Sequence, residues 1–450
     1  MQNKYKSGQL NALKTWFLLA RRWPYFRFTC VLVFSFLTLP TLSHIFSRGD
    51  LALSLFTKNS ESTKSPGSHD LISQAGDPYQ YGIMPQNADT ADAKAAYETW
   101  KSLYITSSGV PDPSNMLRVS TTHDGQGATT SEYQGYGMLF AAHLEEDDAI
   151  LQKLWNYAEY YKNDGGLMVW HIDASGNAEW RQSALDGDMD IAMALDYAAR
   201  RWPGRGWDVH AEIYINSTIA PQKNSFLRTA PIDITEWPRW KRGIYLNYLA
   251  TAYMEHFSNR TGDERWSTIA IPNTYRLLNY SFEQFELPAW FVDEAGQPLT
   301  PNDPWNSQAN RHDTGATRTN WRIASHYLTS GHENAKHWVD KLTAFFEEAG
   351  KRRGGYNTGN FSPTHLRRGY RFMATEQHRA GQPYGDRNQI SEAMLVAAGV
   401  PAMAAGHIEM TNEIYDFLAL APLEKDDTSM DNAMHVMGLL IMSGGLDAIR

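Results

Sequence analysis

The feature that most constrains this chain is the helical spacing of its apolar residues, which dominates from about residue 79 onward. Strand-like alternation is rare over the same length. A chain with this pattern buries helix against helix, as a bundle or as a ring. About eleven amphipathic segments follow one another, at residues 88–104, 134–145, 147–162, 188–202, 244–258, 263–279, 320–330, 334–349, 388–399, 408–420 and 428–442.

The connections between these segments favour a ring over a plain bundle. Three long irregular stretches, residues 203–243, 281–319 and 350–387, alternate with short loops and are rich in Trp, Tyr, Asp and Arg. Binding sites are commonly built in loops of this length and composition. We therefore predict an all-α fold for residues 79–450, an α/α toroid whose inner helices form a bowl.

One short segment departs from the helical spacing. Residues 167–170 read LMVW, and the turn-forming sequence DASG follows at residues 173–176. An apolar run next to a turn of this kind predicts one short hairpin.

The first fifty residues form a targeting segment. Six Lys and Arg residues precede an apolar run at residues 28–45, as in a secretion signal. The run is about 18 residues long, enough to cross a bilayer, and no convincing small-residue cleavage site follows it. The basic flank places the N-terminus inside and the rest of the chain outside. We therefore predict a signal segment or, preferably, an uncleaved membrane anchor through residues 28–45, with an extracytoplasmic (periplasmic or secreted) domain.

Residues 51–78 are polar and rich in Ser, Pro and Gly, which predicts a flexible linker.

Composition excludes several classes of function. The net charge of −9 and the absence of a basic stripe beyond the leader argue against a nucleic-acid partner. The single cysteine, Cys30, lies in the apolar run, so the folded part has no thiol. The His-Asp steps at residues 123–124 and 312–313 lack metal-ligand spacing. We predict a monomer with no metal and no cofactor.

The first candidate site is a carboxylate at a helix start. Residues 130–138 read TSEYQGYGM, in which Ser131 and Gln134 fit a capping box. Glu132 then falls in the first turn, where an acid also stabilises the helix dipole without any other role. Its neighbours favour a site, because Gly135 lets the backbone crowd a pocket and Tyr136 lies close to the acid.

The second candidate site is a run of three acids. Residues 184–194 read ALDGDMDIAMA, so that Asp186, Asp188 and Asp190 lead into a helix. A calcium loop would need further oxygen ligands and a closing Glu, which do not follow. Acids packed this closely are costly unless one has a raised pKa or they share a function.

These two motifs resemble glycoside hydrolase family 8. Residues 131–138 match the family pattern Ser-Glu-Gly-Gln-Gly-Tyr-Gly-Met, with Tyr133 replacing its first glycine. Residues 184–188 match the signature Ala-Ser/Thr-Asp-Ala/Gly-Asp, with Leu185 in the Ser/Thr position. Further similarities run in the same order over about residues 79–450: Trp100-Lys101 and residues 167–170, 287–290, 318–322 and 438–444.

The resemblance implies an (α/α)6 barrel and a glycoside hydrolase that inverts the anomeric centre. It implies that Glu132 is the general acid and that Asp186 binds the sugar at the cleaved bond. An acid on one side of the bond and a base that activates water on the other would be required, with carboxyls roughly 6.5–9.5 Å apart. Burial among aromatic residues would raise the pKa of Glu132 toward neutrality.

The general base is the open question. Much of the family carries a Tyr-Asp-Ala-x-Arg motif whose Asp has this role, and here the aligned position is Gly315, three residues before Arg318. Asp313 would serve if the loop is two residues longer. Other members place the base in an inserted loop, for which Asp293 and Glu294 are the candidates. We favour Asp313 over the others.

Four further residues are predicted to contact the substrate: Trp170, Tyr136, Arg318 and Tyr248. Aromatic rings stack on sugar faces, and the chain has 15 Trp and 23 Tyr, although a large helical core also uses them. The predicted activity is endo-cleavage of a β-1,4-linked glucan. The alternatives on the same fold are a chitosanase, a xylanase or a mixed-linkage β-glucanase. From other classes they are a sugar-binding pseudoenzyme without a base and an anchored helical scaffold.

Overall fold

The computed structural model describes residues 78–178, 181–219, 244–285, 287–293, 295–298, 311–313, 315–353, 356–371, 381–383, 390–423 and 428–445. All of them belong to one compact unit, Pro66–Arg450. The predicted anchor, Cys30 and the linker up to residue 77 lie outside the described residues. Within the described part of the chain, no helix is both long and apolar enough to span a membrane.

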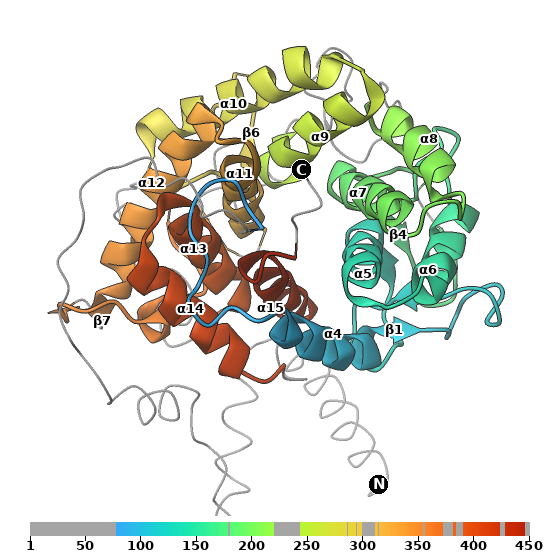
Figure 1. Ribbon diagram of the computed structural model, residues 1–450, viewed down its shortest axis with the longest axis horizontal. Coiled ribbons are helices and arrows are strands. Elements are labelled where there is room, and N and C mark those ends of the chain that lie inside the picture. The colour runs from blue at the N-terminus through green and yellow to red at the C-terminus, as the bar shows by residue number, and fades with distance from the viewer. Residues whose placement is uncertain are drawn as a thin grey trace, which may run out of the picture. The chain divides into compact units, whose positions relative to one another are not determined.

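The described helices form a double ring (Figure 1). Most inner helices are buried on nearly every side, whereas the outer helices bury one face. The inner helices are α5 (Ser131–Leu144), α7 (Leu185–Arg201), α9 (Thr251–Thr261), α11 (Thr317–Ser330), α13 (Glu392–Ala405) and α15 (Ser429–Met442). The outer helices are α4 (Thr90–Tyr104), α6 (Ala149–Tyr160), α8 (Trp207–Ile219), α10 (Ile271–Gln284), α12 (Glu333–Gly350) and α14 (Ile408–Leu420). The predicted all-α toroid is confirmed.

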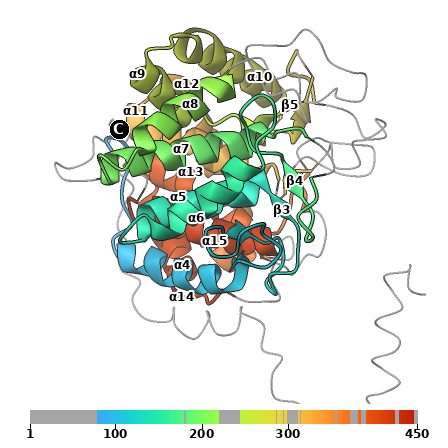
Figure 2. The ribbon, with the colours of Figure 1, turned by 90° about the vertical axis from the view of Figure 1, so that its right-hand side faces the viewer.

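Short two-residue strands decorate the ring. Figure 2 shows that β3, β4 and β5 gather at one end of it. β3 leads directly into α5, so this end carries the N-terminus of that inner helix. The antiparallel pairs are β1 (Ile105–Thr106) with β2 (Arg118–Val119), β3 (Thr129–Thr130) with β4 (His171–Ile172), β5 (Ile244–Tyr245) with β6 (Phe291–Val292), and β7 (Arg352–Arg353) with β8 (Tyr356–Asn357).

Glycines allow α5 and α7 to approach each other closely. A Cβ atom at Gly187 would lie 2.4 Å from the backbone carbonyl carbon of Ser131, and one at Gly135 would lie 2.9 Å from Cβ of Asp190. Both distances are below ordinary van der Waals contact. The first turns of the two helices therefore touch, which brings the two carboxylate motifs together.

Two sequence-based boundaries were wrong. Helix α8 (Trp207–Ile219) lies in the stretch 203–243 that was predicted to be irregular. Its buried residues keep helical spacing, but the exposed β-branched Val209 and Ile213 obscure the pattern. The helix predicted at 244–258 begins only at Thr251, because β5 and the 3₁₀ turn η1 (Leu246–Tyr248) come first.

The predicted hairpin is present only in part. The turn at residues 173–176 is present, since Gly176 N–H donates to the Asp173 carbonyl at 3.0 Å, and across it Asp173 N–H donates to the Asn177 carbonyl at 3.0 Å and Trp170 N–H to the Gln182 carbonyl at 2.7 Å. The strand directly before the turn, β4, pairs with β3. Two further short helices complete the described elements: η2 (Trp266–Ala270) and η3 (Pro363–His365).

Candidate active site

Glu132 lies in the first turn of α5, as predicted, but the predicted capping box is wrong. The N-cap is Thr130, whose hydroxyl accepts from the Tyr133 N–H at 3.4 Å, and Ser131 is already helical. The Gln134 amide bonds to backbone groups of two neighbouring segments and does not reach back to the cap. The cap sets the direction in which α5 starts, and so the place of the Glu132 side chain.

Arg318, in the first turn of α11, joins the two predicted carboxylates. Its Nη1 donates to Asp186 Oδ2 at 2.8 Å and also contacts Glu132 Oε1. The Tyr136 hydroxyl lies 3.3 Å from Arg318 Nη1 and 3.4 Å from Glu132 Oε1. On the other edge of the guanidinium lies the Asn247 amide. Because a guanidinium can only donate, the amide is assigned with its oxygen toward Arg318, where it accepts from Nη2 at 2.6 Å and from Nε at 3.3 Å. The structure therefore brings together Glu132, Asp186, Arg318 and Tyr136.

The surroundings of Glu132 suit a proton donor. Burial raises the pKa of Glu132 to about 7, and the charges of Asp186 and Asp190 act in the same direction while Arg318 opposes them. The side chain keeps 18% of its surface exposed, so a ligand can reach it. A carboxyl with this pKa holds its proton near neutral pH and releases it readily, which is what general acid catalysis requires.

Asp186 has one oxygen in use and one available. The residue is 1% exposed, and its Oδ2 accepts from Arg318. Its Oδ1 is buried with no hydrogen-bond partner. A buried acceptor without a partner costs about 1–3 kcal/mol. A hydroxyl group of a bound ligand would satisfy that oxygen.

The other two acids of the second motif face elsewhere. Asp190, one helical turn below Asp186, forms a two-point ion pair with Arg322 at 3.1 and 2.7 Å, and both side chains are fully buried. Asp188 points toward α8 and accepts from the Tyr214 hydroxyl at 3.3 Å. Burial raises the pKa of Asp188 well above its ordinary value. Only Asp186 of the three therefore reaches Arg318.

The candidate bases differ in their surroundings. Asp313 lies in the loop before α11, where burial raises its pKa against the charges of Arg311 and Arg368, and its Oδ1 is buried without a partner. The carboxylate of Asp293 accepts two backbone N–H groups of its own turn, at 2.9 and 2.8 Å, as a turn-forming Asp does. Glu294 lies outside the described residues.

Position 315 cannot hold a base. A Cβ atom on Gly315 would lie 2.2 Å from the Trp290 indole, which is closer than atoms approach without rearrangement. The Gly315 carbonyl accepts from Arg318 Nε at 3.4 Å. The glycine therefore lets Trp290 pack directly beside the loop that carries Arg318.

Two of the predicted stacking residues lie at this end of the ring. The Trp170 carbonyl accepts from the Ser131 N–H at 3.0 Å, so this half-buried tryptophan lies beside the start of α5. Tyr248 is half-buried and stacks on Tyr245, with ring centroids 4.8 Å apart. Burial and the nearby Asp186 charge raise its pKa. Tyr136 is fully buried, and its hydroxyl contacts Glu132 and Arg318 while its ring packs against Tyr133 and Phe140.

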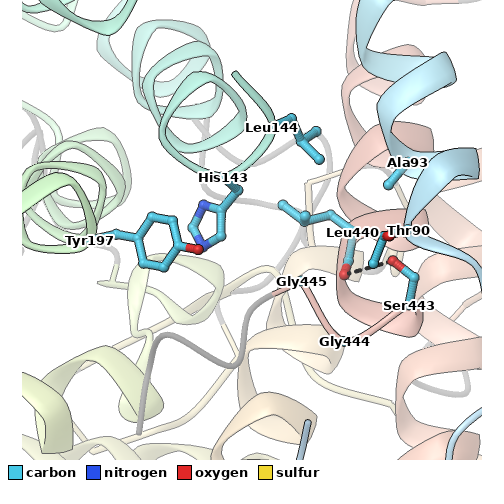
Figure 3. A pocket seen from close by; sticks show the side chains of 9 residues that line it. All are labelled: Thr90, Ala93, His143, Leu144, Tyr197, Leu440, Ser443, Gly444 and Gly445. Atoms are coloured by element: carbon cyan, nitrogen blue, oxygen red, sulfur yellow. Dashed lines mark hydrogen bonds between the residues drawn. The ribbon is translucent and has the colours of Figure 1, made fainter. Parts of the chain in front are cut away.

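A separate cavity of about 310 Å³ lies at the other end of α5 and α15 (Figure 3). The His143 imidazole stacks there on Tyr197, with ring centroids 3.8 Å apart. His143 is eleven residues from Glu132 on the same helix, or about 16 Å along its axis. This cavity is therefore not part of the carboxylate site. No group of three or more His, Cys, Asp or Glu residues in the described ranges could hold a metal ion.

Sequence reasoning missed the roles of three residues at the site: Asn247, and Asp190 with Arg322, which form a buried ion pair. The spacing carried a usable signal for two of them, because Asp186 and Asp190 are four residues apart, as are Arg318 and Arg322. Residues four apart share a helix face, so two such steps predict two ion pairs between two helices. Nothing in the sequence around Asn247 marked it.

A double ring of helices with carboxylates at the first turns of inner helices defines the class: an (α/α)6 barrel with a carboxylate site. The chain belongs to glycosyl hydrolases family 8, whose model matches residues 78–360. Endoglucanase A of Acetivibrio thermocellus is 32% identical over 301 residues, which cover 62% of this chain and 60% of that protein. The β-glucanase of Niallia circulans is 25% identical over 382 residues, or 80% of this chain and 86% of that protein.

Solved structures share the fold. The apo β-1,3-1,4-glucanase from Paenibacillus sp. X4 superposes with a TM-score of 0.66 at 22% identity, over 81% of this chain and 95% of that one. A reducing-end-xylose releasing exo-oligoxylanase mutant complexed with xylobiose gives 0.61 at 14% identity, over 81% and 96%. The chain spans 60%, 59% and 55% of the length of three endoglucanase relatives it matches.

Proposed function

We propose that this protein is an inverting, endo-acting glycoside hydrolase that cleaves a β-1,4-linked glucan. The observation that carries the proposal is the grouping of Glu132 and Asp186 around Arg318, in which the Glu132 side chain stays 18% exposed so that a ligand can reach it. Burial raises the pKa of Glu132 to about 7, which supports the same role. Family membership and the names of the relatives, endoglucanases and a β-glucanase, support a glucan as the substrate. A mixed-linkage glucan is the second candidate, because a β-1,3-1,4-glucanase shares the fold.

In the proposed reaction, Glu132 gives its proton to the glycosidic oxygen as the bond from that oxygen to the anomeric carbon breaks. A water molecule attacks the anomeric carbon from the opposite face, and a carboxylate base takes a proton from that water. The available oxygen of Asp186 binds a hydroxyl of the sugar at the cleaved bond. The base is proposed to be Asp313, which lies in the loop that leads to Arg318 and has a buried Oδ1 without a partner, although the Gly315 backbone N–H also reaches its carboxylate. In Asp293, Oδ1 accepts two N–H groups of its own turn.

The test of activity is the release of reducing ends from a panel of cellulose derivatives, mixed-linkage glucan, xylan and chitosan. Glu132→Gln is expected to lower the rate by roughly 10²–10⁴-fold while oligosaccharide binding persists. Glu413→Gln is the matched control. Burial also raises the pKa of Glu413, on the outer helix α14, to about 7, and the charges of Glu409 and Asp416 act in the same direction. Unchanged turnover in Glu132→Gln would refute the assignment. Binding without turnover in the unmodified protein would favour the pseudoenzyme.

The test of the base compares Asp313→Asn with Asp293→Asn and Glu294→Gln. Only the first is expected to lose activity, by roughly 10²–10⁴-fold, and proton NMR of the first product is expected to show the α-anomer. Activity near that of the unmodified protein in Asp313→Asn would place the base elsewhere.

The location and the assembly are also proposed from the sequence. An apolar segment at residues 28–45 behind a basic leader supports an extracytoplasmic domain held by a membrane anchor. Membrane fractionation of the full chain and of a chain without residues 1–50 would test the anchor. Sedimentation of the latter would test the proposed monomer.

A further inference from the structure

The position of the Arg318 guanidinium is set from two sides. One nitrogen, Nη1, faces the carboxylates of Glu132 and Asp186. The opposite edge, Nη2 and Nε, faces the side-chain oxygen of Asn247 at 2.6 and 3.3 Å. The Gly315 carbonyl adds a longer contact to Nε, 3.4 Å. Asn247 is therefore the nearest group that holds this arginine from the side away from the carboxylates.

Asn247 is built into a fixed part of the fold. It is fully buried and lies in η1, between the strand β5 and the inner helix α9. Pairing of Ile244 with Val292 fixes the strand before it, and a hydrogen bond of 3.1 Å from the Leu249 N–H to the Leu246 carbonyl closes the turn around it. A buried side chain on such a turn has little freedom to follow a moving partner.

The neutral amide of Asn247 matters because the guanidinium could otherwise form a two-point ion pair with a carboxylate. Arginine prefers to meet a carboxylate with two parallel N–H groups. If Nη2 were released, both Nη1 and Nη2 could turn toward Glu132. A two-point pair of that kind would favour the ionised carboxylate and remove the proton that the reaction needs. Asn247 occupies Nη2 without adding a third negative charge to the site.

We propose that Asn247 is a positioning residue for glycosidic cleavage: its amide oxygen holds Arg318 so that only Nη1 meets the two carboxylates. The proposal rests on the proposed hydrolase function, since it concerns the same site. The residue acts through Arg318 and has no role in touching the sugar. The charges that act on the Glu132 carboxyl are those of Arg318 and Arg322 from α11 and of Asp186 and Asp190 from α7. The titratable tyrosines that interact with it are Tyr136, whose hydroxyl bonds to its carboxylate, and Tyr133 from α5, Tyr245 from β5 and Tyr248 from η1.

The test is the pH dependence of kcat/KM in two opposite variants. The alkaline limb of the kcat/KM profile is the fall in rate as Glu132 loses its proton. Asn247→Leu, which frees Nη2, is expected to move this limb to lower pH by about one unit and to lower kcat by roughly tenfold, with little change in KM. Asn247→Asp, which neutralises the guanidinium from behind, is expected to move the limb to higher pH. A merely structural role would lower stability in both without opposite shifts.

Two controls keep this test decisive. Asn432→Ala removes another buried asparagine. Asn432 lies on α15 and donates to the hydroxyl of Tyr104, on α4, at 2.8 Å, and its removal is expected to leave the alkaline limb in place. In an Arg318→Lys background, Asn247→Leu is expected to have no further effect on kcat, because the group it positions is gone. Additive losses in that double variant, or a limb that does not move in either single variant, would overturn the proposal.

A readout without substrate separates this proposal from the proposed function. The Glu132 carboxyl can be titrated by ¹³C NMR, with the Glu132→Gln protein identifying its signal. If the unmodified protein cleaves no glucan, the proposed function fails, and the titration still decides the role of Asn247. Opposite shifts of the Glu132 midpoint in Asn247→Leu and Asn247→Asp support it, and unchanged midpoints contradict it.

Discussion

Two ion pairs one helical turn apart join α7 to α11, and they differ in what else reaches them. The deeper pair, Asp190 with Arg322, is enclosed: it has two hydrogen bonds, of 3.1 and 2.7 Å, and both side chains are fully buried. Arg322 Nε is buried without a partner, and among the described residues no second carboxylate forms an ion pair with Arg322. The upper pair, Asp186 with Arg318, is open. It shares its arginine with Glu132 and leaves one carboxylate oxygen without a partner. The same residue types at the same spacing thus make a structural pair below and a chemical site above.

This difference separates stability from function on one helix face. Burying a charge pair gains little net stability, but removing one partner leaves the other charge buried and unpaired. The deeper pair therefore fixes how α7 and α11 lie against each other. At the upper pair, burial raises the pKa of Glu132 to about 7 although the charge of Arg318 acts in the opposite direction.

The largest expected effect is at the upper pair. Asp186→Ala is expected to lower kcat/KM by about 10³-fold or more, because it removes the group proposed to bind the reacting sugar and frees Arg318 to pair with Glu132. The melting temperature is expected to change little. Asp188→Asn is the control from the same helix, since Asp188 faces α8. Equal losses in the two variants would show that the motif acts as a unit and not through Asp186.

At the deeper pair the effect is expected on stability. Asp190→Ala leaves the Arg322 charge buried without its partner, which costs about 3–5 kcal/mol of unfolding free energy. Denaturant unfolding measures this, and the folded fraction is expected to keep activity within roughly tenfold of the unmodified protein. The double variant Asp190→Ala/Arg322→Met is expected to recover part of the stability. Loss of activity at unchanged stability would erase the distinction between the two pairs.

A smaller effect is expected where α5 meets α7. Gly187→Ala places a methyl group 2.4 Å from the backbone of Ser131, so the two first turns must separate. Overpacking of this kind costs about 1–3 kcal/mol. Because Glu132 and Asp186 sit on those turns, kcat is expected to fall as well. A variant that is destabilised but fully active would mean that the helix approach serves packing alone.

Much of this architecture was predictable because it rests on local rules. Helical spacing located most of the ring, and the position of Glu132 in a first turn followed from the sequence just before it. Helix α8 was missed because β-branched Val209 and Ile213 lie on its exposed side, where the period of the buried residues is harder to see. The capping box failed because Gln134 is used in tertiary contacts that no local pattern reveals.

The site was predictable only as far as its motifs reached. Glu132, Asp186 and Arg318 came together as expected, each at the start of an inner helix. Asn247 was out of reach, since its role depends on a turn between β5 and α9 that faces Arg318 only in the folded chain. The Trp290 ring over Gly315 was equally hidden, because the two residues are distant in sequence and meet by loop packing.

The smallest expected effect is on the pH dependence of stability. A carboxyl whose pKa is raised to about 7 in the folded state, against an ordinary 4.5, loses stabilising free energy as the pH rises through that window. Glu132→Gln is therefore expected to gain stability over the unmodified protein as the pH rises from 5 to 8, by about 1–3 kcal/mol. Glu413→Gln is expected to show the same sign with less magnitude, since solvent screens it more. A gap that stays constant between pH 5 and 8 would mean that Glu132 is already ionised in the folded protein at pH 5.

The most direct test of Glu132 as the proton donor varies the leaving group. A β-cellotrioside of an acidic nitrophenol needs almost no protonation to leave, whereas a sugar hydroxyl leaving from a glucan needs a full proton. Glu132→Gln is expected to lose about 10³-fold or more on the glucan and much less on the aryl glycoside, while Asp313→Asn loses similarly on both. An equal loss on the two substrates in Glu132→Gln would contradict the assignment of the acid.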